Sequence, residues 1–266
     1  MVDNKYKYYC EKCDLGCNII SRWESHIKTE KHLTGQRKKI IPNFPMQKIK
    51  SIISKEDAGE IRQLLKTFFE NKILDKIKDC NRPIVQKYGD FVERNLGRFE
   101  ITPTPLLKKQ IWKRLLKNDT FVKINGETKD FIKKHHNSCK EELCILPVQP
   151  NTKSGTWHRD IFVRSEKDFS IPPFYITQII YLDDKAGTKF CIGSQNNDSD
   201  DDQLYDKKEF RPTALSSILF DGRMLHKGMG NNTNQTRYAI YISYYISSYV
   251  DKESIKKPFL NKEKLC

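Results

Sequence analysis

A histidine and an aspartate stand two residues apart in the segment GTWHRDIF, which covers residues 155–162. In an extended strand, alternate residues project from the same face, so His158 and Asp160 could both reach one metal ion. Two ligands do not complete a metal site, and a third ligand must therefore come from another part of the sequence. The competing interpretation of this pair is an ordinary hydrogen bond between an imidazole and a carboxylate.

The third ligand of such a site would be His135, His136 or His226. The first two stand in the polar segment KKHHNS, which is typical of a helix end or a loop. His226 stands in ILFDGRMLHKGMG, just after an apolar, strand-like stretch and a turn, and we predict that it completes the site. Two imidazoles and one carboxylate leave coordination positions open, a set that is typical of non-haem Fe(II) oxygenases.

An arginine follows the distal histidine at a fixed interval. Arg237 stands eleven residues after His226, at the start of the strand-like segment RYAIYISYY. If the two segments form adjacent antiparallel strands, both residues lie at the same end of a barrel. A guanidinium binds a carboxylate through two parallel hydrogen bonds. The pattern therefore predicts a dicarboxylate co-substrate that also chelates the iron.

This set of motifs resembles the 2-oxoglutarate-dependent Fe(II) oxygenases, and within them the phytanoyl-CoA hydroxylase-like branch. The segment YLDDKAGTKFCIGSQ also resembles a strand–turn region of that branch, with Gly193 and Ser194 aligned. The likeness covers about residues 140–246 and implies a double-stranded β-helix, a distorted jelly roll. It further implies that O2 is a co-substrate and that Arg237 binds the distal carboxylate of 2-oxoglutarate. The carboxylate of Asp160, in place of Gly or Ala, favours hydroxylation over halogenation.

The chain departs from this family pattern at several positions. Gly228 stands two residues after the distal histidine, where some members carry a hydroxyl residue that helps to hold the co-substrate. Ala239 and Gln195 replace two further family residues. Ordinary packing is an equal alternative to ligand contact for the residues that could otherwise line the site, which are Tyr175, Thr177, Gln178, Tyr181, Gln149, Trp157 and Arg159.

A second metal site is predicted near the start of the sequence. Cys10, Cys13, His26 and His32 have the spacing C-x2-C-x12-H-x5-H, which matches a structural zinc site. The long interval between the histidines resembles matrin-type and spliceosomal-type zinc fingers. That resemblance implies binding of double-stranded RNA or of protein, since such fingers recognise shape more than base sequence. A purely structural or protein-docking finger is the alternative.

The elements that must position these residues change in type along the sequence. Ser54 could cap a helix that continues with helical spacing to about residue 77, and a second helix is expected over residues 105–118. After Asn118 the apolar segments are short and rich in β-branched and aromatic residues, which predicts a sheet sandwich or barrel. These segments are TFVKIN, ELCILPVQP, WHRDIFV, FYITQIIYL, TKFCIG, SSILFD and TRYAIYISYYI. The polar, acidic stretch over 194–209 is expected to be a mobile, solvated loop.

These patterns predict a mainly β protein with flanking helices, in which a jelly-roll core follows a small zinc finger. The expected order is a zinc finger (1–40), a linker (41–53), an oxygenase domain (54–250) with helical support over 54–118 and a β-helix core over about 119–250, and a basic C-terminal tail (251–266).

The net charge and the distribution of apolar residues limit the classes of function that this sequence could have. The formal net charge is +14, which favours a nucleic-acid partner, although an AT-biased genome would also produce many lysines. No apolar stretch has the length of about 18 residues that a membrane helix needs, and no signal peptide stands at the N-terminus, so an intracellular protein is expected in the nucleus or the cytoplasm.

The leading hypothesis is a hydroxylase or demethylase that acts on a nucleic acid or a nucleic-acid-associated protein, with Fe(II), 2-oxoglutarate and Zn(II) bound. The alternatives are a small-molecule hydroxylase of the phytanoyl-CoA type and a non-catalytic nucleic-acid-binding protein.

Overall fold

The computed structural model describes residues 8–10, 15–17, 24, 44–74, 87–88, 91–161 and 166–247. The chain divides into two compact units, Met1–Pro42 and Asn43–Cys266. In the first unit, strands β1 (Tyr8–Cys10) and β2 (Leu15–Cys17) form an antiparallel pair. Cys10 therefore ends a strand, while the other predicted zinc ligands, Cys13, His26 and His32, lie outside the described residues.

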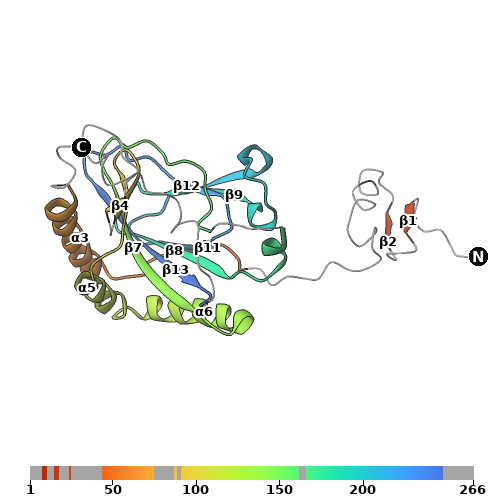
Figure 1. Ribbon diagram of the computed structural model, residues 1–266, viewed down its shortest axis with the longest axis horizontal. Helices are drawn as coiled ribbons and strands as arrows, with labels where there is room; N and C mark the ends of the chain where they lie inside the picture. Colours follow the sequence, from red (N-terminus) through yellow and green to blue (C-terminus); the bar gives the residue numbers. More distant parts are fainter. Residues whose placement is uncertain are drawn as a thin grey trace, which may run out of the picture. The chain divides into compact units, whose positions relative to one another are not determined.

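Two antiparallel sheets form the core of the second unit (Figure 1). The large sheet has the order β3-β11-β8-β13-β7-β6-β5-β4, and the small sheet has the order β10-β9-β12. The strands of the large sheet are β3 (Gln47–Ile49), β4 (Lys87–Tyr88), β5 (Phe91–Asn95), β6 (Arg98–Ile101), β7 (Lys140–Val148), β8 (Tyr175–Tyr181), β11 (Ser217–Asp221) and β13 (Arg237–Tyr245). Those of the small sheet are β9 (Thr188–Ile192), β10 (Asp206–Phe210) and β12 (His226–Gly228).

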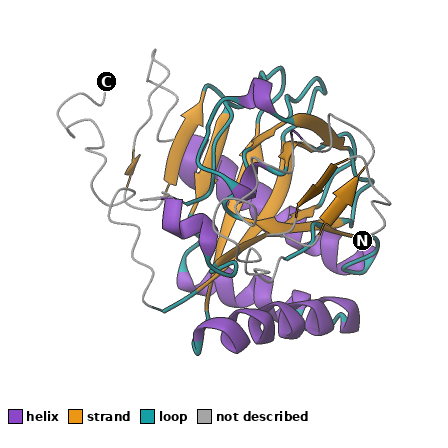
Figure 2. Cartoon of the chain, turned by 90° about the vertical axis from the view of Figure 1, so that its right-hand side faces the viewer, coloured by secondary structure: helices purple, strands orange, loops and turns teal. Residues whose placement is uncertain are grey.

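Three helices cover the outer face of the large sheet, as Figures 1 and 2 show. They are α3 (Lys55–Phe69), which continues into a π-helical turn η1 (Glu70–Leu74), α5 (Pro105–Leu115) and α6 (Asp119–His136). Their apolar faces form one core cluster with the outer face of the sheet. The ring of Phe69 on α3, for example, packs edge-on against Phe99 of β6, with 5.1 Å between ring centroids. None of the helices in the described part of the chain is long and apolar enough to cross a membrane.

The side chains of β13 alternate between the two faces of the large sheet. Tyr238, Ile240, Ile242 and Tyr244 belong to the core beneath the helices. The residues between them project from the opposite face, toward the small sheet, because successive strand residues point to opposite sides. A second apolar cluster fills this space between the sheets and includes Phe190, Phe220, Tyr181 and Ala239. The expected jelly-roll architecture with flanking helices is thus present, and its interior can hold a site.

The expectation of a strand at TFVKIN is wrong, because this segment lies in α6. The buried residues of α6 are Phe121, Asn125, Thr128 and Ile132, which recur at the spacing of a helix rather than of a strand. The helix ends at His136, and the capping residue that follows, Asn137, adopts a left-handed backbone conformation with φ 62°. The strand-rich core that was expected from about residue 119 therefore begins at Lys140, and the expected helical support over 54–118 also contains β4, β5 and β6.

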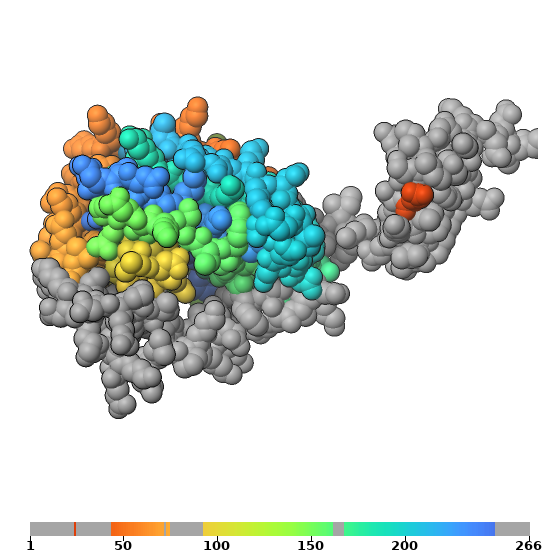
Figure 3. Space-filling model, turned by 90° about the horizontal axis from the view of Figure 1, so that it is seen from above, coloured from red at the N-terminus to blue at the C-terminus, as the bar shows by residue number. Residues whose placement is uncertain are grey.

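Two further expectations change in the structure. The segment WHRDIFV contributes an isolated β-bridge between His158 and His226 instead of a regular strand. The acidic stretch over 194–209 contains two short 3-10 helices, η3 (Ser194–Asn196) and η4 (Asp202–Leu204), and runs into β10. Residues around 200, coloured cyan in Figure 3, lie at the surface. This stretch therefore contains regular secondary structure and ends in the edge strand of the small sheet.

Candidate metal centre

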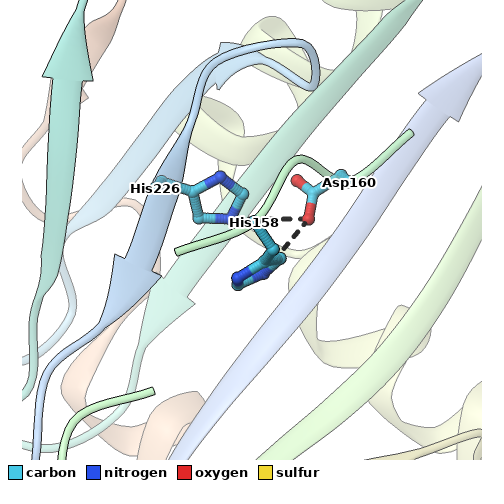
Figure 4. Close-up of side chains that lie close together, drawn as sticks. All are labelled: His158, Asp160 and His226. Carbon is cyan, nitrogen blue, oxygen red and sulfur yellow. Dashed lines mark ion pairs between the residues drawn. The ribbon is translucent and has the colours of Figure 1, made fainter. Parts of the chain in front are cut away.

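His158, Asp160 and His226 meet in one cluster, and their potential ligand atoms all lie within 4.8 Å of one another (Figure 4). The Asp160 Oδ1 atom lies 3.4 Å from His226 Nε2 and 3.9 Å from His158 Nε2. The three residues predicted from spacing are thus brought together from two segments that are far apart in the sequence. Two imidazoles and one carboxylate in this arrangement form a facial set of ligands for a transition metal.

Backbone hydrogen bonds hold the two ligand segments side by side. The amide of His158 donates to the carbonyl of His226, and the amide of His226 donates back to the carbonyl of His158, both at 2.9 Å. The amide of Asp160 donates to the carbonyl of Gly222 at 2.9 Å. The ligand spacing therefore depends on main-chain pairing between the loop after β7 and β12.

The orientation of each imidazole is set through its Nδ1 atom. His226 Nδ1 donates to the carbonyl of Met224 at 2.9 Å, and His158 Nδ1 donates to the carbonyl of Thr156 at 3.0 Å. A carbonyl only accepts hydrogen bonds, so the proton of each neutral ring is held on Nδ1. The Nε2 lone pairs are consequently left for a metal ion, as in most histidine metal sites.

The Asp160 carboxylate is oriented from the opposite side by Thr177, whose hydroxyl donates to Oδ2. Burial alone would raise the pKa of Asp160, but attraction to His226 and His158 and the hydrogen bond from Thr177 together outweigh burial and lower this pKa below its ordinary value. Desolvation, followed by repulsion from His226, lowers the pKa of His158 to about 4. Burial alone would also lower the pKa of His226, and the Asp160 carboxylate raises it instead. At neutral pH Asp160 is therefore ionised and His158 is neutral, which are the forms that bind a cation.

One side of the cluster is open to solvent. The side chain of His158 is 51% exposed, whereas those of Asp160 and His226 are 7% and 4% exposed. The rings of Phe190 and Phe220 pack against His226 from the interior. Among the described residues, the cluster is therefore more exposed on the His158 side than on the side of His226, which aromatic rings cover.

Arg237 lies in the interior at the start of β13 and is 5% exposed. Its guanidinium donates to the carbonyls of Lys185, Met229 and Gly230. Its Nε atom is buried without a hydrogen-bond partner among the described residues. A buried donor that lacks a partner is uncommon in folded proteins. Arg237 thus keeps one buried donor without a partner among the described residues, and its binding of a carboxylate stays a prediction.

The flanking residues named from the sequence fall into two groups. Tyr175 and Thr177 project into the interior, where the Tyr175 hydroxyl donates to Ser243 at 2.7 Å. Tyr181 also lies between the sheets, with its hydroxyl 2.6 Å from that of Thr188. Gln178 projects the other way and accepts a hydrogen bond from Tyr244 at 2.8 Å, so its role is packing.

Three expected pocket walls lie elsewhere. Arg159 turns away from the centre and donates to the carboxylate of Asp200 at 2.7 Å, which fixes the acidic stretch. Trp157 stacks beneath the ammonium of Lys227, with 4.5 Å between the nitrogen and the ring centroid. Gln149 lies beside Gly97, outside the metal cluster.

Ser194 has a structural role beside the metal centre. Its buried hydroxyl donates to the carbonyl of Cys191 at 2.7 Å and accepts from the amide of Leu225 at 2.8 Å. Leu225 immediately precedes His226, so this hydroxyl ties the end of β9 to the start of β12. Gly193, with φ 88°, makes the turn that places Ser194 there.

Sequence reasoning missed Arg98 of β6. Its guanidinium lies over Gly228, where an added Cβ would stand 2.6 Å from Arg98 Nη1. No motif surrounds this arginine in the sequence, and the alternation in RFEI is the only indication that it projects from the face opposite Phe99.

Comparisons with known proteins agree with the fold. No protein-family model matches the sequence, and no curated protein matches it. Among solved structures, AviO1 from Streptomyces viridochromogenes Tue57 is 16% identical, with a TM-score of 0.54 over 78% of this chain and 92% of AviO1. The epimerase SnoN, in complex with Fe3+, alpha ketoglutarate and nogalamycin RO, is 11% identical, with a TM-score of 0.54 over 76% of this chain and 79% of SnoN. These likenesses confirm the predicted jelly-roll fold, whereas the phytanoyl-type branch and the zinc finger stay predictions.

Proposed function

We propose that this protein is an Fe(II)- and 2-oxoglutarate-dependent dioxygenase that hydroxylates or demethylates its substrate. The observation that carries the proposal is the cluster of His158, Asp160 and His226, whose ligand atoms lie within 4.8 Å of one another in a jelly-roll interior that also contains Arg237. SnoN, which shares this fold, binds iron and alpha ketoglutarate, and that supports the same pair of cofactors here.

Each residue of the site would have a separate role in binding iron, binding 2-oxoglutarate or shielding the centre. The two Nε2 atoms and Asp160 Oδ1 would hold iron on one face, which leaves the opposite face for 2-oxoglutarate and O2. When bound, iron and 2-oxoglutarate supply the oxidising chemistry, in which one oxygen atom enters the substrate and the other enters succinate as CO2 is released. Arg237 would bind the distal carboxylate of 2-oxoglutarate. The apolar wall behind His226 would shield the centre from water.

A zinc hydrolase is the main competing enzyme class for these three ligands. A hydrolytic site would need only the ligands and a bound water. It would not account for the buried Arg237, whose Nε has no partner among the described residues. The dicarboxylate-dependent reaction accounts for both the ligands and the arginine.

For the substrate we propose a nucleic acid or a nucleic-acid-associated protein. The net charge of +14 supports a polyanionic partner. The antiparallel pairing of β1 with β2, in which Cys10 ends β1, is compatible with a zinc finger that Cys10 helps to form. A small-molecule substrate is the second candidate, and it is favoured by SnoN, whose complex contains nogalamycin RO.

The decisive measurement is turnover of 2-oxoglutarate by the full chain with Fe(II), ascorbate and O2. We expect succinate to form slowly without substrate and faster with the true substrate, and we expect Asp160→Ala to abolish both rates. If succinate does not form, or forms equally in Asp160→Ala, the dioxygenase assignment is wrong. Stimulation by RNA or DNA oligonucleotides that disappears at high salt would support the nucleic-acid substrate, whereas stimulation only by small molecules would support the second candidate.

A further inference from the structure

Two arginines lie in one row across the large sheet. Val148 of β7 pairs with Arg237 of β13 on one side and with Arg98 of β6 on the other. Residues that stand opposite one another in neighbouring strands project from the same face of a sheet. Because Phe99 lies in the core beneath the helices, Arg98 projects from the interior face. Both guanidinium groups therefore enter the same interior space.

The two guanidinium groups converge on one backbone segment. Arg98 Nη2 donates to the carbonyl of Met229 at 2.8 Å, and Arg237 Nη2 donates to the same carbonyl at 3.3 Å. Arg98 also lies against Gly228, where the missing side chain leaves room for its Nη1 atom. Gly228 stands two residues after His226 in β12, which places it about 7 Å farther along the strand. This separation is comparable to the length of a five-carbon dicarboxylic acid.

The two positive charges have little compensation within the protein. Among the described residues, neither arginine forms an ion pair, and the Nε atoms of both are buried without a partner. Asp183 is the nearby carboxylate that raises the pKa of Arg237, but its oxygens are occupied by Arg62 and by the amide of Tyr238. Desolvation, followed by repulsion from Arg237, lowers the pKa of Arg98 to about 10. Arg237 is buried and Arg98 is partly buried, and two like charges placed side by side with little access to water favour an anion between them.

We infer that Arg98 and Arg237 together bind the distal carboxylate of a 2-oxo dicarboxylic acid whose oxoacid end binds at the metal centre, an inference that rests on the proposed function. Arg98 is thus a second binding residue for the co-substrate, supplied by a strand that precedes the metal ligands by about 60 residues of sequence. The acid would be bound by two guanidinium groups from two different strands. A residue larger than glycine at position 228 would collide with Arg98, which occupies the space beside it.

Calorimetric titration of the Mn2+-loaded full chain tests this role without turnover. Two ligands are compared, 2-oxoglutarate and 2-oxopentanoate, which has a methyl group in place of the distal carboxylate and keeps the same chelating end. We expect Arg98→Met to weaken 2-oxoglutarate binding tenfold to a hundredfold, a change of about 1.4–2.8 kcal/mol. Binding of 2-oxopentanoate should change by less than about twofold. Arg98→Lys should recover part of the loss.

Two further variants separate this role from a general effect on folding. Gly228→Ala places a methyl group against Arg98 and should weaken 2-oxoglutarate alone, whereas Arg211→Met, which removes an exposed arginine, should change neither ligand. If Arg98→Met binds both acids as the unchanged protein does, or weakens both equally, the role of Arg98 is overturned and the proposed function stands. If the unchanged protein binds neither acid, the proposed function fails and this inference fails with it.

Discussion

The metal ligands are prepared for binding by atoms outside the metal's own coordination shell. Each imidazole donates through Nδ1 to a backbone carbonyl two residues earlier in the chain, at Met224 or Thr156. The third ligand differs, because Asp160 is oriented by a side chain, the hydroxyl of Thr177. A substitution at Thr177 therefore tests how far the metal affinity depends on such a neighbour.

Thr177→Val keeps the shape of the side chain and removes the hydrogen bond to Asp160 Oδ2. Because removal of such outer partners costs about 10-fold to 100-fold in metal affinity at other sites, we expect Fe(II) or Mn2+ to bind at least about tenfold more weakly. Equilibrium dialysis against a competing chelator measures the change. Thr177→Ser restores the hydroxyl and should bind metal nearly as tightly as the unchanged protein. Equal affinity in Thr177→Val would show that Asp160 is oriented by the backbone alone.

A second test at the residue scale concerns the hydroxyl that fixes the approach to His226. Ser194→Ala leaves the amide of Leu225 and the carbonyl of Cys191 without their buried partner. A buried group that loses its partner costs about 1–3 kcal/mol, so we expect the free energy of unfolding in urea to fall by that amount. Ser247→Ala, at an exposed serine after β13, is the control and should change stability by less than about 0.5 kcal/mol. If Ser194→Ala left the free energy of unfolding unchanged, a water molecule would have replaced the hydroxyl as the partner of these two backbone groups.

The cluster of His158, Asp160 and His226 could be predicted from the sequence because the chemistry and spacing of these residues are local or nearly so. His158 and Asp160 stand two residues apart, and His226 follows a recognisable strand and turn. Arg98 could not be predicted in this way. Its position depends on the pairing of β6 with β7, a contact between distant segments that leaves no spacing pattern in the sequence. Site residues supplied by remote strands become visible only once the sheet order is known.

At the scale of elements, the helix α6 shows where local patterns mislead. The segment TFVKIN is short, apolar and partly β-branched, and such a run fits a strand or a buried helix equally well. The burial pattern of α6 identifies the segment as part of a helix, because helical spacing of the buried residues extends well beyond the six residues. These buried residues are Phe121, Asn125, Thr128 and Ile132. Longer periodic segments were predicted correctly, such as α3 with its cap at Ser54 and α5 near its expected position.

The start of α3 is joined to the start of α6 through one buried carboxylate. Ser54 Oγ accepts from the amide of Asp57 at 3.0 Å and donates to its carboxylate at 2.8 Å. Asn118, which precedes α6, donates to the same carboxylate at 3.0 Å.

Ser54→Ala removes the cap and should lower the free energy of unfolding by about 1 kcal/mol. Urea denaturation at neutral pH measures the change, and Ser54→Thr, which keeps a hydroxyl that can accept from the Asp57 amide and donate to its carboxylate, should lose much less stability.

The same carboxylate predicts a dependence of stability on pH. Burial alone would raise the pKa of Asp57, but hydrogen bonds from Ser54 and Asn118 and the charge of Lys117 lower it below 3.8. A pKa that is lower in the folded state gives stability that is present above pH 3.8 and is lost as the pH falls through the folded pKa. Asp57→Asn should therefore be less stable than the unchanged protein at pH 7, and its disadvantage should shrink toward pH 3. Asp130→Asn, an exposed change on α6, should keep the original pH profile. A constant disadvantage of Asp57→Asn at every pH would contradict the ionised role.

At the scale of the whole molecule, the chain combines two units with different predicted metals. The second unit brings the predicted iron ligands together through long-range strand pairing, whereas the predicted zinc ligands all lie within 32 residues of the start of the sequence. Thiolates and imidazoles favour zinc, and a facial set with a carboxylate favours iron. The two sites should therefore fill independently and with different metals.

Metal analysis by mass spectrometry after anaerobic reconstitution tests this independence. We expect the full chain to hold one zinc and one iron, Cys10→Ser to lose the zinc and keep the iron, and His226→Ala to lose the iron and keep the zinc. Cys139→Ser changes a free cysteine remote in sequence from both sets of ligands and should lose neither metal. Each substitution should remove one metal alone, because the predicted ligands of one site supply nothing to the other. Loss of both metals in Cys10→Ser would mean that the first unit is needed for the second to fold, and zinc at both sites would overturn the assignment of iron to His158, Asp160 and His226.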